Sequence, residues 1–303
     1  MIIEQFLNRK SRIGTKLVLN TYNLRQQLTK IREWFNKEEI QYRKEAVKKI
    51  SDKLTFEIKH ENGFLVLDGI ECFPEIQEII DESLKIVAEN DPETIRKNKK
   101  SQLLIGLLPK ENLSLDSPFM RFALRKEVIG AISRYLGIVP ILNSVDVWYS
   151  KSKKTETMTD SQLYHLDWAA QTQIKIFIYA MDVPGESGPL VVMEAGASKK
   201  LQEQLHYKYE SRVQDDIAEK HVGNDVQHVM TGKKGTAIIA DTSRCFHYGS
   251  RVKDENHYRV LALFQYLPPQ AFLLPLKYNK NSNYSFLSND TLPEYQQLVL
   301  GAK

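Results

Sequence analysis

Five short segments in the second half of the chain constrain its fold more than any other feature. They are rich in β-branched and aromatic residues and are bounded by Gly, Pro, Asn or Asp, at residues 141–150, 173–183, 188–196, 235–241 and 258–269. This pattern is typical of strands joined by turns. One strand pattern and two amphipathic helical patterns precede them, at 62–70, 74–90 and 119–137. Helices followed by a series of strands predict an α+β fold whose mainly β core is a barrel or a sandwich.

We expect one large domain with an N-terminal arm. The chain has 303 residues, of which 42% are hydrophobic, so it can bury a sizeable core, and no repeated or linker-like segment divides it. We assign residues 1–55 to a helical arm and residues 56–303 to the main domain, which contains a polar helical insert at about 198–221. This insert is either a mobile lid or a static surface helix. The sequence does not indicate an oligomeric state.

The arm is basic. Residues 1–53 carry a net charge of +7, while the rest of the chain carries −3. Apolar residues recur in it at three- and four-residue steps, as a helix requires: Leu24, Leu28, Ile31, Trp34 and Phe35. A basic helix can contact nucleic acid. Interleaved glutamates favour an ion-paired, solvated surface instead, and no nucleic-acid-binding motif accompanies the charge, so we expect no nucleic-acid partner.

The composition also bears on the location of the protein. No apolar run approaches the roughly 18–20 residues that a membrane span needs. Glu4 and Asn8 interrupt the segment in which a signal peptide would have its apolar core. The chain has only two cysteines, which suit a reducing compartment better than a disulfide framework. The sequence therefore predicts a cytoplasmic protein with no membrane partner.

A histidine and an aspartate stand two residues apart near the head of the segment 161–182, which leads into the second strand pattern. If His165 and Asp167 lie on a strand, their side chains point to the same face. A polar pair at a strand edge is the simplest interpretation of such a motif taken alone. His247, about eighty residues later, follows another strand pattern. Two imidazoles and one carboxylate on a β scaffold form the facial triad that holds non-haem Fe(II) and leaves other coordination positions open.

Other metal chemistry has less support. A zinc hydrolase would be expected to show a His-Glu-x-x-His motif or paired cysteines, and the chain has neither. The remaining histidines include His206, His221 and His228, which lie in or beside the polar insert and are expected to be solvated.

Arg259 adds a second element to the site. In the strand predicted over 258–269 it shares a face with Leu261 and Leu263. A buried guanidinium needs a partner, and a carboxylate suits its planar fork. No Asp or Glu of the sequence is evidently placed to serve, so a ligand carboxylate is the natural candidate. An arginine at the rim that faces water is the alternative.

These four residues, taken in order with the segment 178–200 between them, resemble the phytanoyl-CoA dioxygenase family of Fe(II)/2-oxoglutarate oxygenases. The resemblance covers roughly residues 60–270. The chain departs from the family pattern at residues 196–199, which read Gly-Ala-Ser-Lys where the family often has a Ser-His pair. Its arginine also comes about one residue later than is usual.

The resemblance implies a double-stranded β-helix, a jelly-roll or cupin-like barrel, flanked by N-terminal helices. It implies that the catalytic iron ligands are His165, Asp167 and His247. It further implies that Arg259 grips the far carboxylate of 2-oxoglutarate and that Ser250 adds a hydroxyl to the same group. Fe(II) would be the cofactor, with 2-oxoglutarate and O2 as cosubstrates.

The implied reaction is hydroxylation of an unactivated C–H bond of a small-molecule metabolite, with release of succinate and CO2. Asp167 argues against halogenation, because halogenating relatives lack this carboxylate. Desaturation or epimerisation would use the same ligands. The alternative from another class is a catalytically silent β-helix that binds a small molecule or a partner. Lys151, Lys153, Lys154 and the basic segment 95–101 would favour an anionic substrate if they line the mouth of the site, but ordinary solvated lysines are the preferred interpretation.

Overall fold

The computed structural model describes residues 21–50, 55–92, 94–95, 103–151, 158–253, 256–278, 280 and 282–302. Lys153, Lys154 and most of the basic segment 95–101 lie outside these residues, as does the first part of the arm. None of the helices within these ranges combines the length and the apolar character that a membrane span requires.

Helices occur at both ends of the chain and in two groups within it. They are α3 (Tyr22–Phe35), α4 (Lys37–Ile50), α5 (Gly69–Cys72), α6 (Glu75–Asn90), α8 (Pro118–Ala123), α9 (Lys126–Leu136), α10 (Ala195–Gln204), α11 (Asp215–Val222) and α12 (Glu294–Leu300). The strands are β1 (Phe64–Asp68), β2 (Ile105–Gly106), β3 (Ile141–Lys151), β4 (Ile174–Tyr179), β5 (Leu190–Met193), β6 (Gln227–Met230), β7 (Thr236–Ala240), β8 (His247–Tyr248) and β9 (Tyr258–Leu267).

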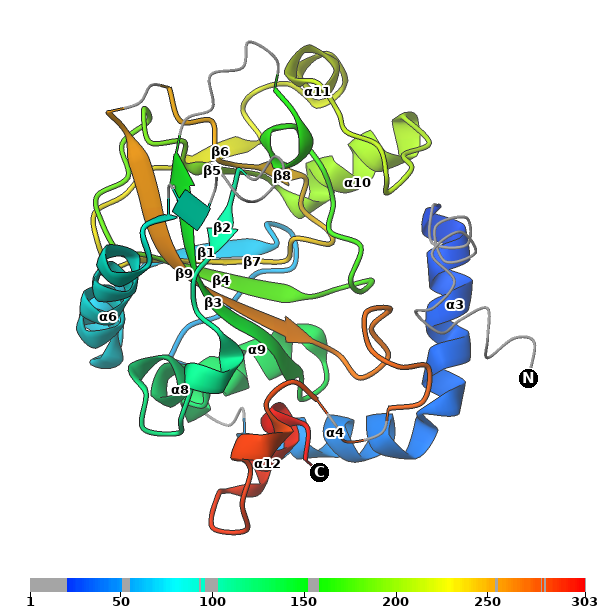
Figure 1. Ribbon diagram of the computed structural model, residues 1–303. Helices are drawn as coiled ribbons and strands as arrows, with labels where there is room; N and C mark the ends of the chain where they lie inside the picture. The colour runs from blue at the N-terminus through cyan, green and yellow to red at the C-terminus, as the bar shows by residue number, and fades with distance from the viewer. Residues whose placement is uncertain are drawn as a thin grey trace.

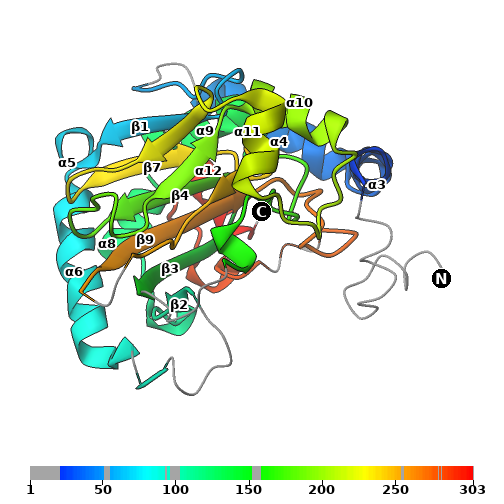
Figure 2. The ribbon, with the colours of Figure 1, turned by 90° about the horizontal axis from the view of Figure 1, so that it is seen from above.

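The strands form two antiparallel sheets. The larger has six strands in the order β1-β7-β4-β9-β3-β2, and the smaller has three in the order β6-β5-β8. Figure 1 shows α6, α8 and α9 on one side of the large sheet, with the small sheet, α10 and α11 on the other. Figure 2 shows β1, β7, β4, β9 and β3 side by side in that order. A large antiparallel sheet covered by helices agrees with the predicted mixed fold and mainly β core.

The two faces of the large sheet bury different sets of side chains. Alternate residues of β4, β7 and β9 contribute to the main hydrophobic cluster, which they share with α6, α8 and α9. The residues between them face the small sheet and pack against Leu190 and Val192 of β5; these are Phe177, Tyr179, Ile238, Leu261 and Leu263. Because both faces of β9 are covered, its sequence is nearly continuously apolar. The space between the two sheets is where the candidate site lies.

The predicted insert is a packed layer. Its α10 and α11 cover the outer face of the small sheet, where Leu201, Tyr207 and Tyr209 belong to the same buried cluster as Val191 and Met193. The Tyr207 hydroxyl also accepts a hydrogen bond of 3.3 Å from the backbone N–H of Leu166. This packing favours a static surface layer over a mobile lid.

The apolar repeat of the arm does not form its buried face. Within α3, Leu28 is buried, whereas Leu24, Ile31 and Trp34 are exposed and Trp34 retains 71% of its accessible surface. Arg25 and Arg32 are buried in their place. Arg32 donates to the backbone carbonyls of the loop after β9, at Gln270, Ala271, Leu274 and Pro275. A guanidinium has five donors, so one buried arginine can satisfy several loop carbonyls that a leucine would leave unpaired.

Candidate metal centre

The two halves of the predicted triad come together across an isolated bridge. His165 and His247 exchange two backbone hydrogen bonds of 3.1 Å, and the N–H of Asp167 donates to the carbonyl of Thr242 at 2.8 Å. The segment from His165 to Asp167 is therefore extended, but it is not the start of the strand as the sequence suggested. The strand β4 begins only at Ile174.

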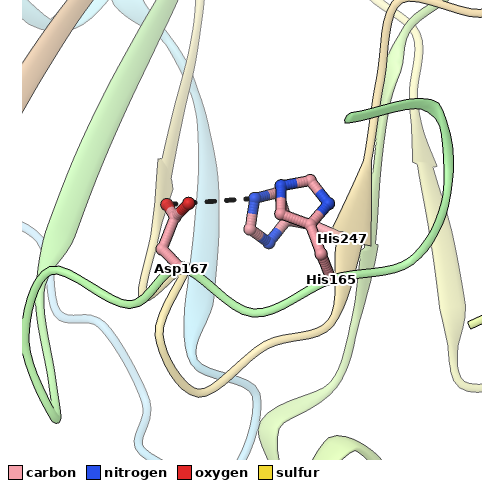
Figure 3. Close-up of side chains that lie close together, drawn as sticks. All are labelled: His165, Asp167 and His247. Carbon is pink, nitrogen blue, oxygen red and sulfur yellow. Dashed lines mark ion pairs between the residues drawn. The ribbon is translucent and has the colours of Figure 1, made fainter. Parts of the chain in front are cut away.

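This pairing places the three side chains against one another, as Figure 3 shows. One potential ligand atom from each of His165, Asp167 and His247 lies within 4.8 Å of the other two. The Nε2 atom of His247 is 4.0 Å from Oδ2 of Asp167, and the two imidazole centroids are 4.3 Å apart. In the described part of the chain, this is the one group of three such residues placed to share a metal ion.

Backbone carbonyls orient both imidazoles. Nδ1 of His165 is 2.9 Å from the carbonyl of Leu163, and Nδ1 of His247 is 3.0 Å from that of Cys245. A carbonyl can only accept, so each Nδ1 carries the proton and each Nε2 keeps a free lone pair. Burial, together with the neighbouring His247, lowers the pKa of His165 to about 3, and burial also lowers the pKa of His247. Both rings are neutral at pH 7, the form in which histidine binds metals.

Asp167 is held by two donors on the same oxygen. Its Oδ2 accepts from Nε2 of Gln173 at 2.9 Å and from Nζ of Lys175 at 2.7 Å. Burial raises the pKa of Asp167, but the charge of the Lys175 ammonium and its hydrogen bond to the carboxylate lower it, and the pKa lies below its usual range. The carboxylate is therefore ionised.

Lys175 is the site residue that the sequence analysis missed. It stands on β4, which otherwise reads Ile-x-Ile-Phe-Ile-Tyr, and it shares a face with Phe177 and Tyr179. A lysine on the inward face of an apolar strand was the available signal, because such a cation needs a buried partner. Gln173 extends the network, since its Nε2 also donates to Thr242 and its Oε1 accepts from Gln265.

Arg259 lies in the same space and lacks a carboxylate partner within the described ranges. It is 3% exposed, and its Nη2 donates to the Ser250 hydroxyl at 3.1 Å. Its Nε and Nη1 have no hydrogen-bond partner among the described residues, and neither has the hydroxyl of Ser150, which is opposite Arg259 in the β3–β9 register. Burial lowers the pKa of Arg259, and the nearby Tyr179 phenol acts in the opposite direction.

The chain next to His247 brings this guanidinium close to the triad. A Cβ atom on Gly249, two residues after His247, would be 3.4 Å from Nη2 of Arg259. Ser250 follows with a φ of 60°, a value that residues other than glycine rarely adopt. Nε and Nη1 of Arg259 and the hydroxyl of Ser150, all buried, form a set of donors that an incoming carboxylate could satisfy.

No protein-family model and no curated protein matches the chain. Among solved structures, it is similar to EctD from S. alaskensis with 2-oxoglutarate and 5-hydroxyectoine, at 17% identity and a TM-score of 0.48, over 78% of this chain and 83% of that chain. It is also similar to the non-haem alpha-ketoglutarate-dependent epimerase SnoN from nogalamycin biosynthesis, at 13% identity and a TM-score of 0.45, over 74% and 84% of the two chains. A third is HygX from Streptomyces hygroscopicus with nickel and 2-oxoglutarate bound, at 15% identity and a TM-score of 0.41, over 69% and 83%.

Proposed function

We propose that the protein is a non-haem Fe(II)- and 2-oxoglutarate-dependent dioxygenase that hydroxylates an unactivated C–H bond of a small molecule and releases succinate and CO2. The observation that carries the proposal is the convergence of His165, Asp167 and His247 in the space that also holds Arg259. Neutral imidazoles and an ionised carboxylate are the donor set that Fe(II) accepts in a facial triad.

In this proposal His165 and His247 bind the iron through Nε2, and Asp167 binds it through its carboxylate. The bound iron, with 2-oxoglutarate and O2, supplies the oxidising chemistry. The chain contributes orientation. The carbonyls of Leu163 and Cys245 fix the tautomer of each imidazole, and Gln173 holds the carboxylate. Such partners of the ligands typically matter 10–100-fold for metal affinity or activity.

Arg259 binds the distal carboxylate of 2-oxoglutarate in the same proposal. Its Nε and Nη1, which have no partner among the described residues, suit a carboxylate, while its Nη2 already donates to Ser250. The hydroxyls of Ser250 and Ser150 lie beside it as further groups for this carboxylate. Leu261, two residues after Arg259 on the same face of β9, belongs to the apolar cluster between the sheets, and such surroundings exclude water from the pair.

The fold belongs to the proposal as well. Two antiparallel sheets that enclose the triad support a double-stranded β-helix and a place among the phytanoyl-CoA dioxygenase-like enzymes. Both cysteines are free, which supports a cytoplasmic location.

The charges at the site favour a small acidic substrate. Lys175 and Arg259 line the space between the sheets, and Arg212 is close enough to lower the pKa of both histidines. With a divalent ion and a dianionic cosubstrate added to Asp167, Lys175 and Arg259, one positive charge remains unbalanced. An anionic group on the substrate would balance it.

One observation favours the silent alternative, a protein on this scaffold that binds a ligand without catalysis. The Lys175 ammonium already neutralises Asp167 without a metal ion. Iron-dependent turnover separates the two functions.

The test is an anaerobic titration with Fe(II) and 2-oxoglutarate, followed by succinate release on addition of O2 and a panel of small acids. Asp167→Ala should abolish turnover while the circular dichroism spectrum stays that of the wild type. Asp182→Ala is the matched control, because Asp182 pairs with Lys233 on the exposed surface. Normal turnover by Asp167→Ala would refute the ligand assignment.

A further inference from the structure

We propose that Lys175 and the metal ion compete for Asp167: the lysine neutralises this carboxylate in the metal-free protein and must withdraw when the metal binds. This inference rests on the proposed function, since it concerns how the metal site of that function is filled. It also assigns a role to a buried lysine that the oxygenase chemistry does not require.

The surrounding structure fixes the position of Lys175. It lies opposite Gln265 of β9 in the centre of the large sheet, and its side chain is 13% exposed. Its Nζ is 2.7 Å from Oδ2 of Asp167 and 5.8 Å from the centroid of the Trp148 ring. Within the described ranges, Asp167 is the one carboxylate with which Lys175 forms an ion pair.

The bonding of Asp167 explains why the two cations exclude each other. Its Oδ2, the oxygen 4.0 Å from Nε2 of His247, already accepts two hydrogen bonds, from Lys175 and Gln173, which use both of its lone pairs, so a metal ion can bind this oxygen only if a donor leaves it. A divalent ion on the same carboxylate would also face an ammonium of the same sign inside the protein, where like charges repel more strongly than in water. The four-carbon stem of lysine is flexible, so the ammonium can turn away and leave the carboxylate to the metal.

A different role for Lys175 predicts the opposite sign. If the lysine holds Oδ2 so that the other oxygen faces the metal, it is a positioning residue, and its loss should weaken metal binding. If it competes with the metal, its loss should strengthen metal binding. Metal affinity therefore decides between the roles without any measurement of activity.

The experiment measures the dissociation constant of Mn(II), and of Fe(II) under anaerobic conditions, by calorimetric titration. Lys175→Met removes the charge and keeps the length of the side chain, and Lys175→Gln provides a second uncharged variant if the first folds poorly. Both should bind Mn(II) at least about tenfold more tightly than the wild type, because a like charge next to the ion is gone. The metal-free variants should also have lower thermal midpoints, because the buried Asp167 loses its counter-ion.

Two controls accompany these variants. Lys175→Arg keeps the charge and should retain wild-type affinity to within a few-fold. Lys233→Met removes a lysine that pairs with Asp182 at 2.9 Å on the exposed surface, and it should change neither quantity.

Unchanged affinity of Lys175→Met and Lys175→Gln for Mn(II), or a loss of tenfold to a hundredfold, would overturn the inference. Different results would refute the proposed function and the competition. If the wild type binds iron and turns over 2-oxoglutarate but Lys175→Met binds metal no better, the function stands and the competition does not. If only the uncharged variants bind metal, the competition stands and the oxygenase assignment does not.

Discussion

Replacing Arg259 by leucine gives the sharpest test of how the cosubstrate binds, because functional and structural roles for this residue make opposite predictions. The guanidinium is 3% exposed and two of its nitrogens have no partner among the described residues. If it binds the distal carboxylate of 2-oxoglutarate, Arg259→Leu leaves that carboxylate buried and unpaired. Truncating one partner of a buried charge pair costs about 2–5 kcal/mol. Binding of 2-oxoglutarate should weaken by roughly 30-fold to several thousandfold, since each 1.4 kcal/mol is tenfold.

The stability of the ligand-free protein should respond differently. Arg259→Leu removes the hydrogen bond to Ser250, which is worth about 0.5–1.5 kcal/mol. The same change removes a buried cation that has no carboxylate partner in the described chain, and the desolvation of such an ion costs several kcal/mol. The variant should therefore be at least as stable as the wild type without ligand, and its thermal midpoint should rise less when 2-oxoglutarate is added.

The assay is the dissociation constant of 2-oxoglutarate in the presence of Mn(II), measured with the thermal midpoint on the same samples. Arg259→Lys should recover only part of the affinity, because an ammonium cannot reproduce a bidentate contact. Arg251→Leu is the matched control. Arg251 is committed to a bidentate pair with Asp215, at 2.5 and 2.7 Å, and stacks on Tyr248, so its loss should leave the affinity for 2-oxoglutarate unchanged.

Unchanged affinity together with a lowered thermal midpoint for Arg259→Leu would show that the arginine is a structural residue. The cosubstrate would then need another cation, and Lys175 on the inward face of the sheet would be a candidate.

Two further predictions concern residues around the site. Arg25→Met and Arg32→Met should both lower the thermal midpoint. Only Arg25→Met should also weaken metal binding, because Arg25 donates to the carbonyls of Trp168 and Ala170, just after Asp167. Equal metal affinity in the two variants would contradict this prediction. Burial raises the pKa of Asp241 to about 6, so its contribution to stability is full below pH 4 and declines as pH rises through 6. Asp241→Asn should remove that decline. Between pH 4 and 7, the free energy of unfolding of the variant, measured by urea titration, should rise relative to that of the wild type by up to about 3 kcal/mol. Parallel pH profiles of the two proteins would contradict this prediction.

The strands were predictable because their packing leaves a direct mark on the sequence. The patterns at 141–150 and 258–269 became β3 (Ile141–Lys151) and β9 (Tyr258–Leu267), whose ends differ from the predictions by one or two residues. Within β9, the inward position of Arg259 followed from simple alternation with Leu261 and Leu263. The grouping of His165, Asp167 and His247 was predicted from the order of these residue types along the chain and from the family resemblance, and the three side chains do lie together.

The hydrogen-bond partners of the site residues were not predictable, because these contacts depend on which loops come together in the fold. Gln173 contacts Thr242 and Gln265, which are 69 and 92 residues away in the chain, and no local pattern records such contacts. The isolated bridge between His165 and His247 is too short to leave a periodic signal. For the same reason the break between Asp167 and the start of β4 at Ile174 was missed.

The arm shows most clearly where hydropathy fails as a guide to burial. In α3 the positions of the buried residues are decided by unpaired carbonyls on the surface that the helix covers, and arginine satisfies them better than leucine. Arg25 donates to the loop after Asp167 at 2.8 and 3.1 Å, and its guanidinium stacks 3.7 Å from the centroid of Tyr209 and 4.6 Å from that of Phe272. One side chain of the arm thus joins the loop after Asp167, the insert and the segment after β9. The described part of the arm therefore supplies donors to the loop that follows Asp167.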